Sequence, residues 1–368
     1  MTGGCGAGQT ATDMARFADA KETYLRGFLK LSAGLPSHDT FSRLFRLLDL
    51  VKFSAWFQRF TAAFDAELRG VIAVDGKVLR RSHDKARRKS ALHMVSAWGC
   101  KAGLLLAQIA TDAKSNEITA VPKLLAMLAL KGTIVTVDAL NCQRAIAAQI
   151  VAQGGDYALP LKENQPSLLA DVSLFLDDPA TKPDERHQSV DADHGRIETR
   201  TATVSSEIGW LTKTQKWPGL RAIGKLVRER ESDGKTSPET AYHVISTPMS
   251  AERFNQVVHA HWRAHWQVKN RLHWRLDVVM NEDQTRNRAG HGAHNLAVLR
   301  HMALNVMQKD GTKESLRAKF QKAGWNERYL NQLTGDVLKC DCPWRPWPAS
   351  CAAYPGVIEP TVFARRLR

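Results

Sequence analysis

The sequence has few of the features that mark secreted, membrane-spanning or disulfide-rich proteins. It has six cysteines in 368 residues and no CxxC pair, so neither a disulfide framework nor a zinc module is expected. No run approaches the roughly 18 consecutive apolar residues that indicate a membrane-spanning helix. The N-terminus has no charged segment followed by an apolar stretch, so no secretory signal is predicted. Together these absences predict a reduced, cytosolic protein.

Acidic residues are also in deficit. Lys and Arg number 52 against 37 Asp and Glu, which gives a net charge of +15. Such an excess favours an acidic partner, of which nucleic acid is the commonest, although a generic basic protein has the same balance. The hydrophobic content of 43% and charged content of 24% are ordinary for a globular chain and exclude a mostly disordered one.

The first part of the chain has a helical pattern. Phe41, Leu44, Phe45 and Leu48 recur at the spacing of one helix face, and Ser37 before them is a favoured N-cap residue. We therefore predict an N-terminal helical domain over residues 1–66.

The middle of the chain alternates between strand-like and helical patterns. Three strand-like runs come first, at 71–74, 92–98 and 104–109. They are followed by a helix at 118–130, a strand at 133–137, a helix at 143–152, a strand at 157–161 and a helix at 163–175. This order predicts an α/β fold of the RNase H-like type, with a mixed sheet flanked by helices.

The composition changes again near Asp177. Strand-like runs at 200–205, 222–227 and 241–245 indicate a β-rich insertion at about 177–250, and helices resume at 251 and 295. We predict that the core domain spans 67–310. Residues 311–368 would then form a C-terminal helix and an irregular tail. From about Thr334 the tail has no helical or strand periodicity.

Two aspartates follow apolar runs, Asp75 in VIAVDGK and Asp138 in TIVTVDA. Carboxylates at strand ends lie at the rim of a sheet, where side chains of neighbouring strands converge. Converging carboxylates that share Mg²⁺ are what metal-assisted phosphoryl transfer requires. The alternative is that both are turn formers, since Asp75-Gly76 is itself a turn signal.

Seven runs carry a resemblance to a known family. They read GLPSHDTFSRLF, IAVDGKVLRRS, QIATDAKSNEITAVPKLL, VTVDALNCQ, YALPLKENQP, HGRIETR and HWQVKNRLHWRLDVVMNEDQTR. In this order they resemble the ISAs1 family of insertion-sequence transposases, within the IS4-like DDE group that includes the H-repeat-associated proteins of Rhs elements. The resemblance covers roughly residues 14–333.

The resemblance implies an RNase H-like core interrupted by a β-rich insertion, and a DDE site. It implies that Mg²⁺ or Mn²⁺ bound by Asp75 and Asp138 supports cleavage and joining of DNA at element ends. It further implies two DNA partners, terminal inverted repeats and target DNA, a homodimer in the DNA complex, and a bacterial cytoplasmic location at the nucleoid.

This chain departs from the family pattern at the position of the third acid. The family reads His-Trp-x-Ile-Glu-Asn where this chain reads His265-Trp266-Gln267-Val268-Lys269-Asn270, so Lys269 occupies the position of the glutamate. A protonated lysine does not ligate Mg²⁺, and its charge opposes metal binding. We expect a copy that keeps its fold and DNA surface but has lost most of its chemistry.

Other acids of the chain are candidates to replace the missing third acid. Glu198 lies in the insertion and Glu282-Asp283 lie beyond the helix, and the resemblance assigns none of them as third ligand. Glu117 in KSNEIT reads as an acid at a helix N-terminus, favoured there by the helix dipole.

Basic residues near these motifs are candidates for phosphate contacts, which are electrostatic and salt-dependent. The candidates are Arg80, Arg81, Arg87, Arg88, Lys89, Lys162, Arg196, Arg200, Arg263 and Arg271. The alternative for the run at 80–89, less favoured than a phosphate contact, is a solvated basic hairpin. Trp262, Trp266 and Trp274 would either stack on an exposed base or pack in the core.

Three functions remain open from the sequence. The first is an insertion-sequence transposase that is impaired at Lys269. The second is a DNA-binding protein that occupies element ends or inhibits intact copies, and the third is a remnant without function. Cleavage would indicate the first, end binding without cleavage the second, and failure to bind either end the third.

Overall fold

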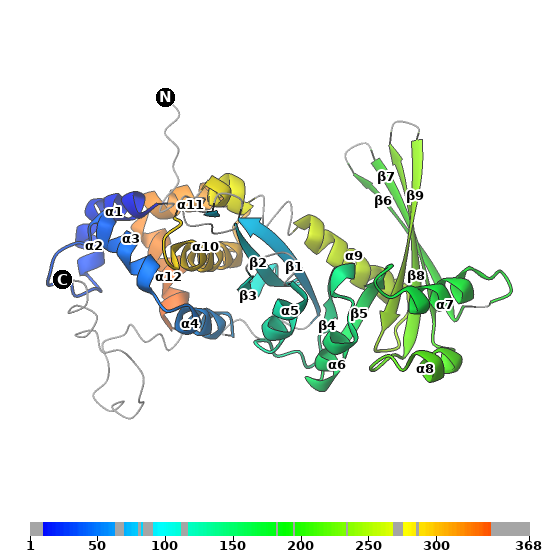
Figure 1. The fold of residues 1–368 in the computed structure, drawn as a ribbon. Helices are drawn as coiled ribbons and strands as arrows, with labels where there is room; N and C mark the ends of the chain where they lie inside the picture. Colours follow the sequence, from blue (N-terminus) through cyan, green and yellow to red (C-terminus); the bar gives the residue numbers. More distant parts are fainter. Residues whose placement is uncertain are drawn as a thin grey trace. The chain divides into compact units, whose positions relative to one another are not determined.

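The computed structural model describes residues 10–62, 70–79, 82–83, 91–111, 117–181, 183–193, 196–232, 235–267, 275–284 and 287–339. The chain divides into two compact units (Figure 1). One contains the helices up to residue 63 and from residue 276 onward, and the other spans residues 64–275. The helix at 292–309 therefore belongs with the N-terminal helices, whereas the sequence pattern places it at the end of the core domain.

The helical unit packs shorter helices against one long, largely buried helix, α10 (Gly292–Lys309). The shorter helices are α1 (Ala11–Ala20), α2 (Glu22–Arg26), α3 (His38–Leu47), α4 (Leu50–Ala62), α11 (Leu316–Trp325) and α12 (Glu327–Lys339). Ser37 caps α3 as predicted, accepting a hydrogen bond from the Thr40 amide. The Asn295 amide on α10 donates to the carbonyls of Phe45 and Leu48, both at 2.9 Å, and so satisfies groups at the end of α3 that have no partner within the helix.

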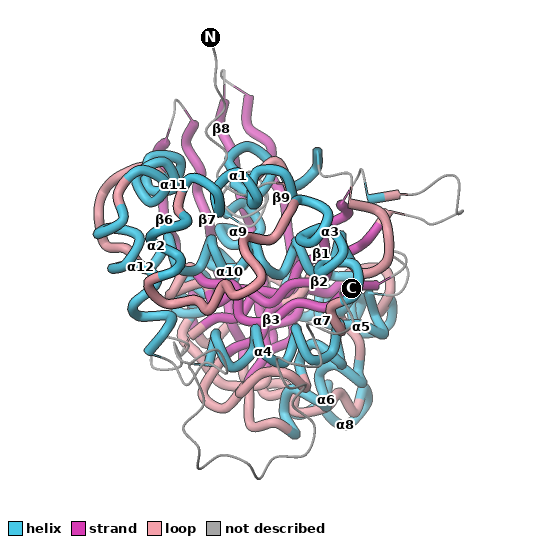
Figure 2. Tube along the Cα trace, turned by 90° about the vertical axis from the view of Figure 1, so that its left-hand side faces the viewer, coloured by secondary structure: helices cyan, strands magenta, loops and turns pink. Residues whose placement is uncertain are grey.

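The second unit is built on one nine-stranded sheet, of order β3-β2-β1-β4-β5-β9-β8-β7-β6, with its strands in magenta in Figure 2. Its first five strands are β1 (Val71–Leu79), β2 (Leu92–Gly99), β3 (Leu104–Thr111), β4 (Ile134–Thr136) and β5 (Asp156–Leu161). β1 pairs antiparallel with β2, and β2 with β3, while β1, β4 and β5 run parallel. This order confirms the RNase H-like mixed α/β fold.

Helices cover the sheet because both of its faces are apolar. On one face, Val74 and Val95 pack with Val121 of α5 (Glu117–Leu125) in a core that also includes α6 (Arg144–Ala152) and α7 (Pro166–Asp177). On the other face, Val71 and Ala158 pack against Val257 of α9 (Ala251–Gln267). Burial on both faces is typical of parallel strands and accounts for the near-continuous apolar runs that reveal them in the sequence.

The β-rich insertion is present and continues the same sheet. It consists of β6 (Glu185–Asp193), β7 (Arg196–Ser205), α8 (Gly209–Gln215), β8 (Ala222–Ser232) and β9 (Lys235–Ile245). β9 pairs antiparallel with β5, with Ala158 opposite Ile245. The sequence pattern misses β6, because its residues ERHQSVDAD form a polar edge strand without an apolar face.

Two local predictions are wrong. β1 does not end before Asp75 but continues to Leu79, pairing with β2 along its length, so Asp75-Gly76 is not a turn. The region after Thr334 is also not wholly loop, since α12 continues to Lys339; residues from 340 onward lie outside the described part. No helix among the described residues is long and apolar enough to cross a membrane.

Candidate active site

Strand register brings Asp75 and Asp138 to the same place. β1 and β4 run parallel with Ala73 beside Thr136, and each aspartate lies two residues further along its chain. Because side chains alternate between faces along a strand, Asp75 projects to the face of Thr136, and Asp138, two residues past the end of β4, lies close enough for the charge of Asp75 to raise its pKa. That face is the one covered by α9, since Thr136 Oγ1 is hydrogen-bonded to His261 Nδ1 at 2.8 Å.

Asp138 is held by the turn that it begins. Its Oδ1 accepts hydrogen bonds from the main-chain amide of Asn141 at 3.2 Å and from Asn141 Nδ2 at 2.6 Å. Burial raises the pKa of Asp138, the Asn141 hydrogen bonds oppose that rise, and the negative charges of Glu117 and Asp75 add to it. Asp138 therefore lies in a region of concentrated negative charge, which a cation would relieve.

The pair fits a hard divalent cation. Asp75 is half-buried, with Oδ1 accepting from the Gly76 amide at 2.9 Å, and both hydrogen bonds to Asp138 use Oδ1. Mg²⁺ in phosphoryl-transfer sites is commonly held by one or two carboxylates together with water and substrate phosphate. Within the described residues, no group of three or more His, Cys, Asp or Glu is arranged to hold a metal. Asp75 and Asp138 are therefore candidate protein ligands, not a complete metal site.

Glu117 is the residue near the site that sequence reasoning missed. It does lie in the first turn of α5, as predicted, but its side chain is buried. Glu117 Oε1 lies 2.5 Å from His93 Nε2, and Oε2 accepts from Asn141 Nδ2 at 3.4 Å. The sequence carries no signal for this contact, because residues 93, 117 and 141 meet only once the sheet has formed.

Gly76 makes room for the Glu117 carboxylate. A Cβ at this position would lie 2.4 Å from Glu117 Oε1 and 2.5 Å from His93 Nε2, both of which belong to buried side chains. We expect Gly76→Ala to lower the free energy of unfolding by about 1–3 kcal/mol, as overpacking does in a closed core.

Urea unfolding followed by circular dichroism measures this effect. The matched control is Gly209→Ala at the start of α8, where an added Cβ meets nothing within 4 Å. That change should be neutral or slightly stabilising. Equal stability of the two variants would show that Glu117 does not pack against β1.

A second loop supports the turn after Asp138. Asn164 Nδ2 donates to the carbonyl of Ala139 at 2.9 Å, and Gln165 Nε2 donates to that of Cys142 at 3.1 Å. Lys162, one of the predicted phosphate contacts, is exposed in this same loop. The structure therefore places one predicted basic residue, Lys162, in the loop that contacts the turn after Asp138.

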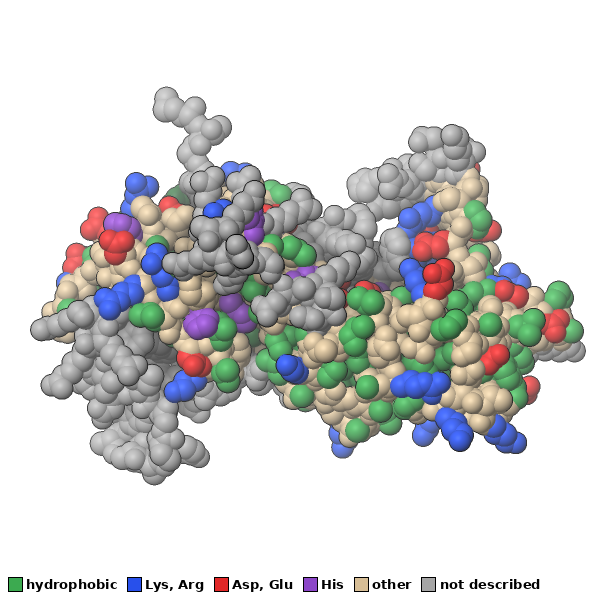
Figure 3. All heavy atoms as spheres, in the orientation of Figure 1, with side chains coloured by type: hydrophobic (Ala, Val, Ile, Leu, Met, Phe, Trp, Pro, Cys, Tyr) green, Lys and Arg blue, Asp and Glu red, His purple; other side chains and the backbone are tan. Residues whose placement is uncertain are grey.

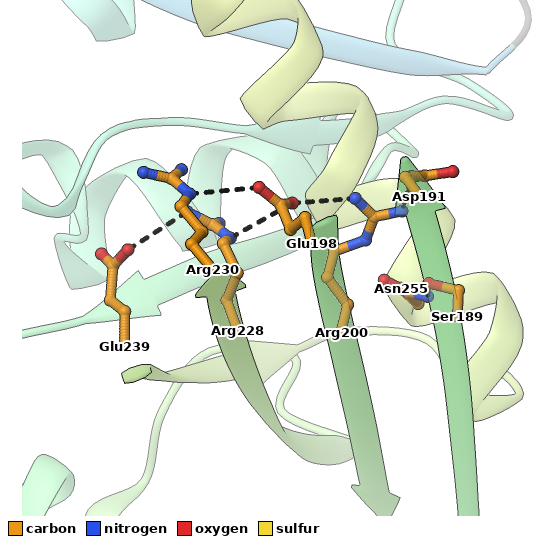
Figure 4. A network of polar contacts seen from close by, with 8 residues as sticks. All are labelled: Ser189, Asp191, Glu198, Arg200, Arg228, Arg230, Glu239 and Asn255. Carbon is orange, nitrogen blue, oxygen red and sulfur yellow. Dashed lines mark hydrogen bonds and ion pairs between the residues drawn. The ribbon is translucent and has the colours of Figure 1, made fainter. Parts of the chain in front are cut away.

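Arg200 has surroundings that differ from those predicted. It is buried in β7, where its guanidinium pairs with Asp191 and with Glu198, the latter at 2.9 Å (Figure 4). Glu198 also accepts from Arg230 Nε at 3.1 Å. A phosphate would have to displace these carboxylates, so we assign Arg200 to the ion-pair network of the insertion rather than to an open DNA surface.

Most of the other predicted contacts lie outside the described residues. These are Arg80, Arg81, Arg87, Arg88, Lys89 and Arg271, and the position of the expected third acid, Lys269, lies outside them as well. Arg196 and Arg263 lie in β7 and α9, but their side chains are not described. On the face drawn in Figure 3, the described Lys and Arg side chains are interspersed with carboxylates.

Comparison with known proteins identifies the family. A family model described as Transposase DDE domain matches residues 67–306, and a second, described as DDE_Tnp_1-associated, matches residues 3–61. The chain belongs to the DDE transposase family. The chain is 37% identical over 336 residues to the H repeat-associated putative transposase YhhI of Escherichia coli K12, covering 89% of this chain and 88% of YhhI.

Two further relatives and one solved structure are similar. The putative protein YbfL of Escherichia coli K12 shows the same identity and coverage as YhhI. An uncharacterized protein in the dhlA 3′ region of Xanthobacter autotrophicus is 44% identical over 238 residues, covering 63% of this chain and 80% of that protein. The piggyBac transposase in a synaptic complex with hairpin DNA aligns at a TM-score of 0.34 and 9% identity, over 87% of this chain and 67% of that one.

Proposed function

We propose that this chain is an insertion-sequence transposase of the ISAs1 type that binds the terminal inverted repeats of its element. Its reaction is metal-dependent cleavage of DNA at the element ends and transfer of the strands to target DNA. The observation that supports the proposal is the proximity of Asp75 on β1 to Asp138 just past the parallel strand β4, in an RNase H-like sheet of a member of the DDE transposase family.

Each residue of the site has a part in this reaction. Asp75 and Asp138 hold Mg²⁺ or Mn²⁺, which when bound stabilises the charge on the attacking and leaving oxygens of the phosphate. Asn141 orients Asp138. Asn164 and Gln165 hold the turn that contains Asp138 and Asn141. The exposed Lys162 contacts the DNA backbone beside them.

Lys269 impairs the reaction in this copy. It occupies the position where the family pattern has its third acid, so it brings a positive charge to a centre that binds a cation. This residue also favours a second function, in which the chain occupies element ends without cutting them and inhibits intact transposase. Both functions share the same DNA partner and a homodimer in the DNA complex.

Domain organisation follows from the same proposal. Residues 1–66 form the transposase-associated helical domain, 67–310 the catalytic domain with its insertion, and 311–368 a C-terminal extension, with α10 at the end of the catalytic segment packing among the N-terminal helices. The remaining predicted phosphate contacts lie in the catalytic domain, with the densest run at 80–89 following β1.

End binding tests the proposal directly. We expect the purified chain to bind its own element ends at least about 1,000-fold more tightly than scrambled DNA of equal length, which is the lower end of the usual range of specific over non-specific binding. Affinity should fall steeply with salt, because phosphate contacts release counterions. A gel-shift titration at several salt concentrations measures both effects.

The same preparation then separates the two functions. Slow Mn²⁺-dependent cleavage of the bound ends supports an impaired transposase, and binding without any cleavage supports the inhibitor. Equal affinity for ends and scrambled DNA would contradict both.

A further inference from the structure

Glu117 reaches the aspartates from the opposite face of the sheet. The Cβ direction at Gly76 points toward Glu117 and His93, which lie on the α5 side. Because neighbouring residues of a strand point to opposite faces, Asp75 projects to the α9 side. β4 ends at Thr136, and Asn141 in the turn beyond it contacts carboxylates from both sides.

A chain of contacts joins Glu117 to Asp138. His93 Nε2 lies 2.5 Å from Glu117 Oε1, Asn141 Nδ2 lies 3.4 Å from Glu117 Oε2, and the same nitrogen lies 2.6 Å from Asp138 Oδ1. His93, Glu117 and Asn141 are only 3%, 2% and 2% exposed. The path is therefore enclosed by protein from His93 to Asp138.

Glu117 and Asp138 together fix which way the Asn141 amide faces. An amide nitrogen carries two hydrogens, and here one is directed to each carboxylate. Turning the amide over would place its oxygen against two negative groups. With the nitrogen fixed toward Asp138 Oδ1, the second oxygen of Asp138 is left to a cation.

The position of Glu117 at a helix N-terminus does not account for this arrangement. The helix dipole favours an acid in the first turn equally well when it is exposed to solvent. Burial of a carboxylate is costly unless it is paired, and here it is paired with buried His93 in space that the missing Gly76 side chain provides. Gly76 on β1, His93 on β2 and Asn141 in the turn after β4 thus together accommodate the Glu117 carboxylate next to the metal site.

We propose that Glu117 is a positioning residue of the metal centre, which, supported by His93, orients Asn141 and through it Asp138. The inference rests on the proposed function, in which Asp75 and Asp138 bind a divalent cation. Residues next to metal ligands in other proteins commonly affect affinity by about 10–100-fold.

Mn²⁺ titration of the DNA-free full-length protein, followed by the EPR signal of free Mn²⁺, tests this role without an activity assay. Glu117→Gln should weaken Mn²⁺ binding by about 10-fold, and Asn141→Ala by a similar factor. The double variant should bind no more weakly than Asn141→Ala alone, because Glu117 acts through Asn141. Glu229→Gln on β8 makes the same charge change at an exposed position and should leave binding unchanged.

The outcomes distinguish failure of this inference from failure of the proposed function. If Asp75→Asn and Asp138→Asn leave Mn²⁺ binding unchanged, the metal centre itself is refuted. If both weaken it but Glu117→Gln does not, the positioning role alone is overturned, as it is if Glu117→Gln and Asn141→Ala have additive effects.

Two further measures keep the test decisive. Asn141→Ala leaves the pair of Glu117 and His93 intact, so unchanged Mn²⁺ affinity in that variant overturns the proposal even if Glu117→Gln does not fold. A parallel series in the Lys269→Glu chain ensures that weak binding by the natural protein does not conceal the effect.

Discussion

Lys269→Glu is expected to raise metal-dependent cleavage at the element ends by at least about 100-fold over the natural chain. The substitution removes a positive charge from the cation site and restores a carboxylate ligand, a net change of two charge units. Opposite unit charges about 4 Å apart interact by about 4 kcal/mol at an effective dielectric constant near 20, so a larger gain is within reach. Single-turnover cleavage of labelled element ends in Mn²⁺ measures the change.

Matched variants separate the parts of this effect. Lys269→Gln removes the repulsion without adding a ligand and should recover only a fraction of the rate. Lys213→Glu reverses an exposed charge on α8 and should change nothing. Adding Asp75→Asn to Lys269→Glu should abolish cleavage. A natural chain that already cleaves as fast as Lys269→Glu would show that Lys269 does not impair the site.

The core sheet was predictable from sequence because its signals are local. β4 and β5 are buried on both faces, so their apolar runs are evident, and Asp138 comes directly after one of them. The extent of β1 was not predictable in this way. Whether Asp75-Gly76 turns or continues depends on the ladder with β2, whose partner residues lie about twenty positions away.

The remainder of the site depends on contacts that are distant in sequence. Glu117 looks like an ordinary helix-start acid until β2 brings His93 beside it and the turn after β4 brings Asn141. Arg200 similarly looks like a phosphate contact, because a basic motif does not reveal that carboxylates on its own and a neighbouring strand pair with it. The sequence shows which residues are charged, but the register of the sheet determines which of them form contacts.

Glu198→Gln is expected to destabilise the insertion by about 3 kcal/mol. Glu198 accepts from Arg200 and Arg230 and lies 3.7 Å from Arg228 Nε, and the side chains of Arg200 and Arg228 are only 6% exposed (Figure 4). Removing one partner from a buried ion-pair network leaves charges uncompensated, which costs about 3–5 kcal/mol. The lower end applies because Glu198 is partly exposed. Urea unfolding of the β-sheet circular dichroism signal measures the loss.

Glu239→Gln provides the matched control. Glu239 meets only one of these arginines, Arg228 at 3.1 Å, and its side chain is 62% exposed, so its loss should cost at most about 1 kcal/mol. Equal destabilisation by the two variants would contradict a network centred on Glu198.

Acid should reduce the difference between Glu198→Gln and the natural chain. Burial alone would raise the pKa of Glu198, but hydrogen bonds from Arg200 and Arg230 and the charges of Arg228 and Arg200 outweigh it and hold the pKa below its ordinary value. A depressed pKa contributes stability above the unfolded-state value, near 4.3, which is lost as pH falls through the folded-state value. Urea midpoints of the two proteins should therefore differ most near neutral pH and converge below about pH 4, and a difference that does not change with pH would show that Glu198 is not held ionised by these arginines.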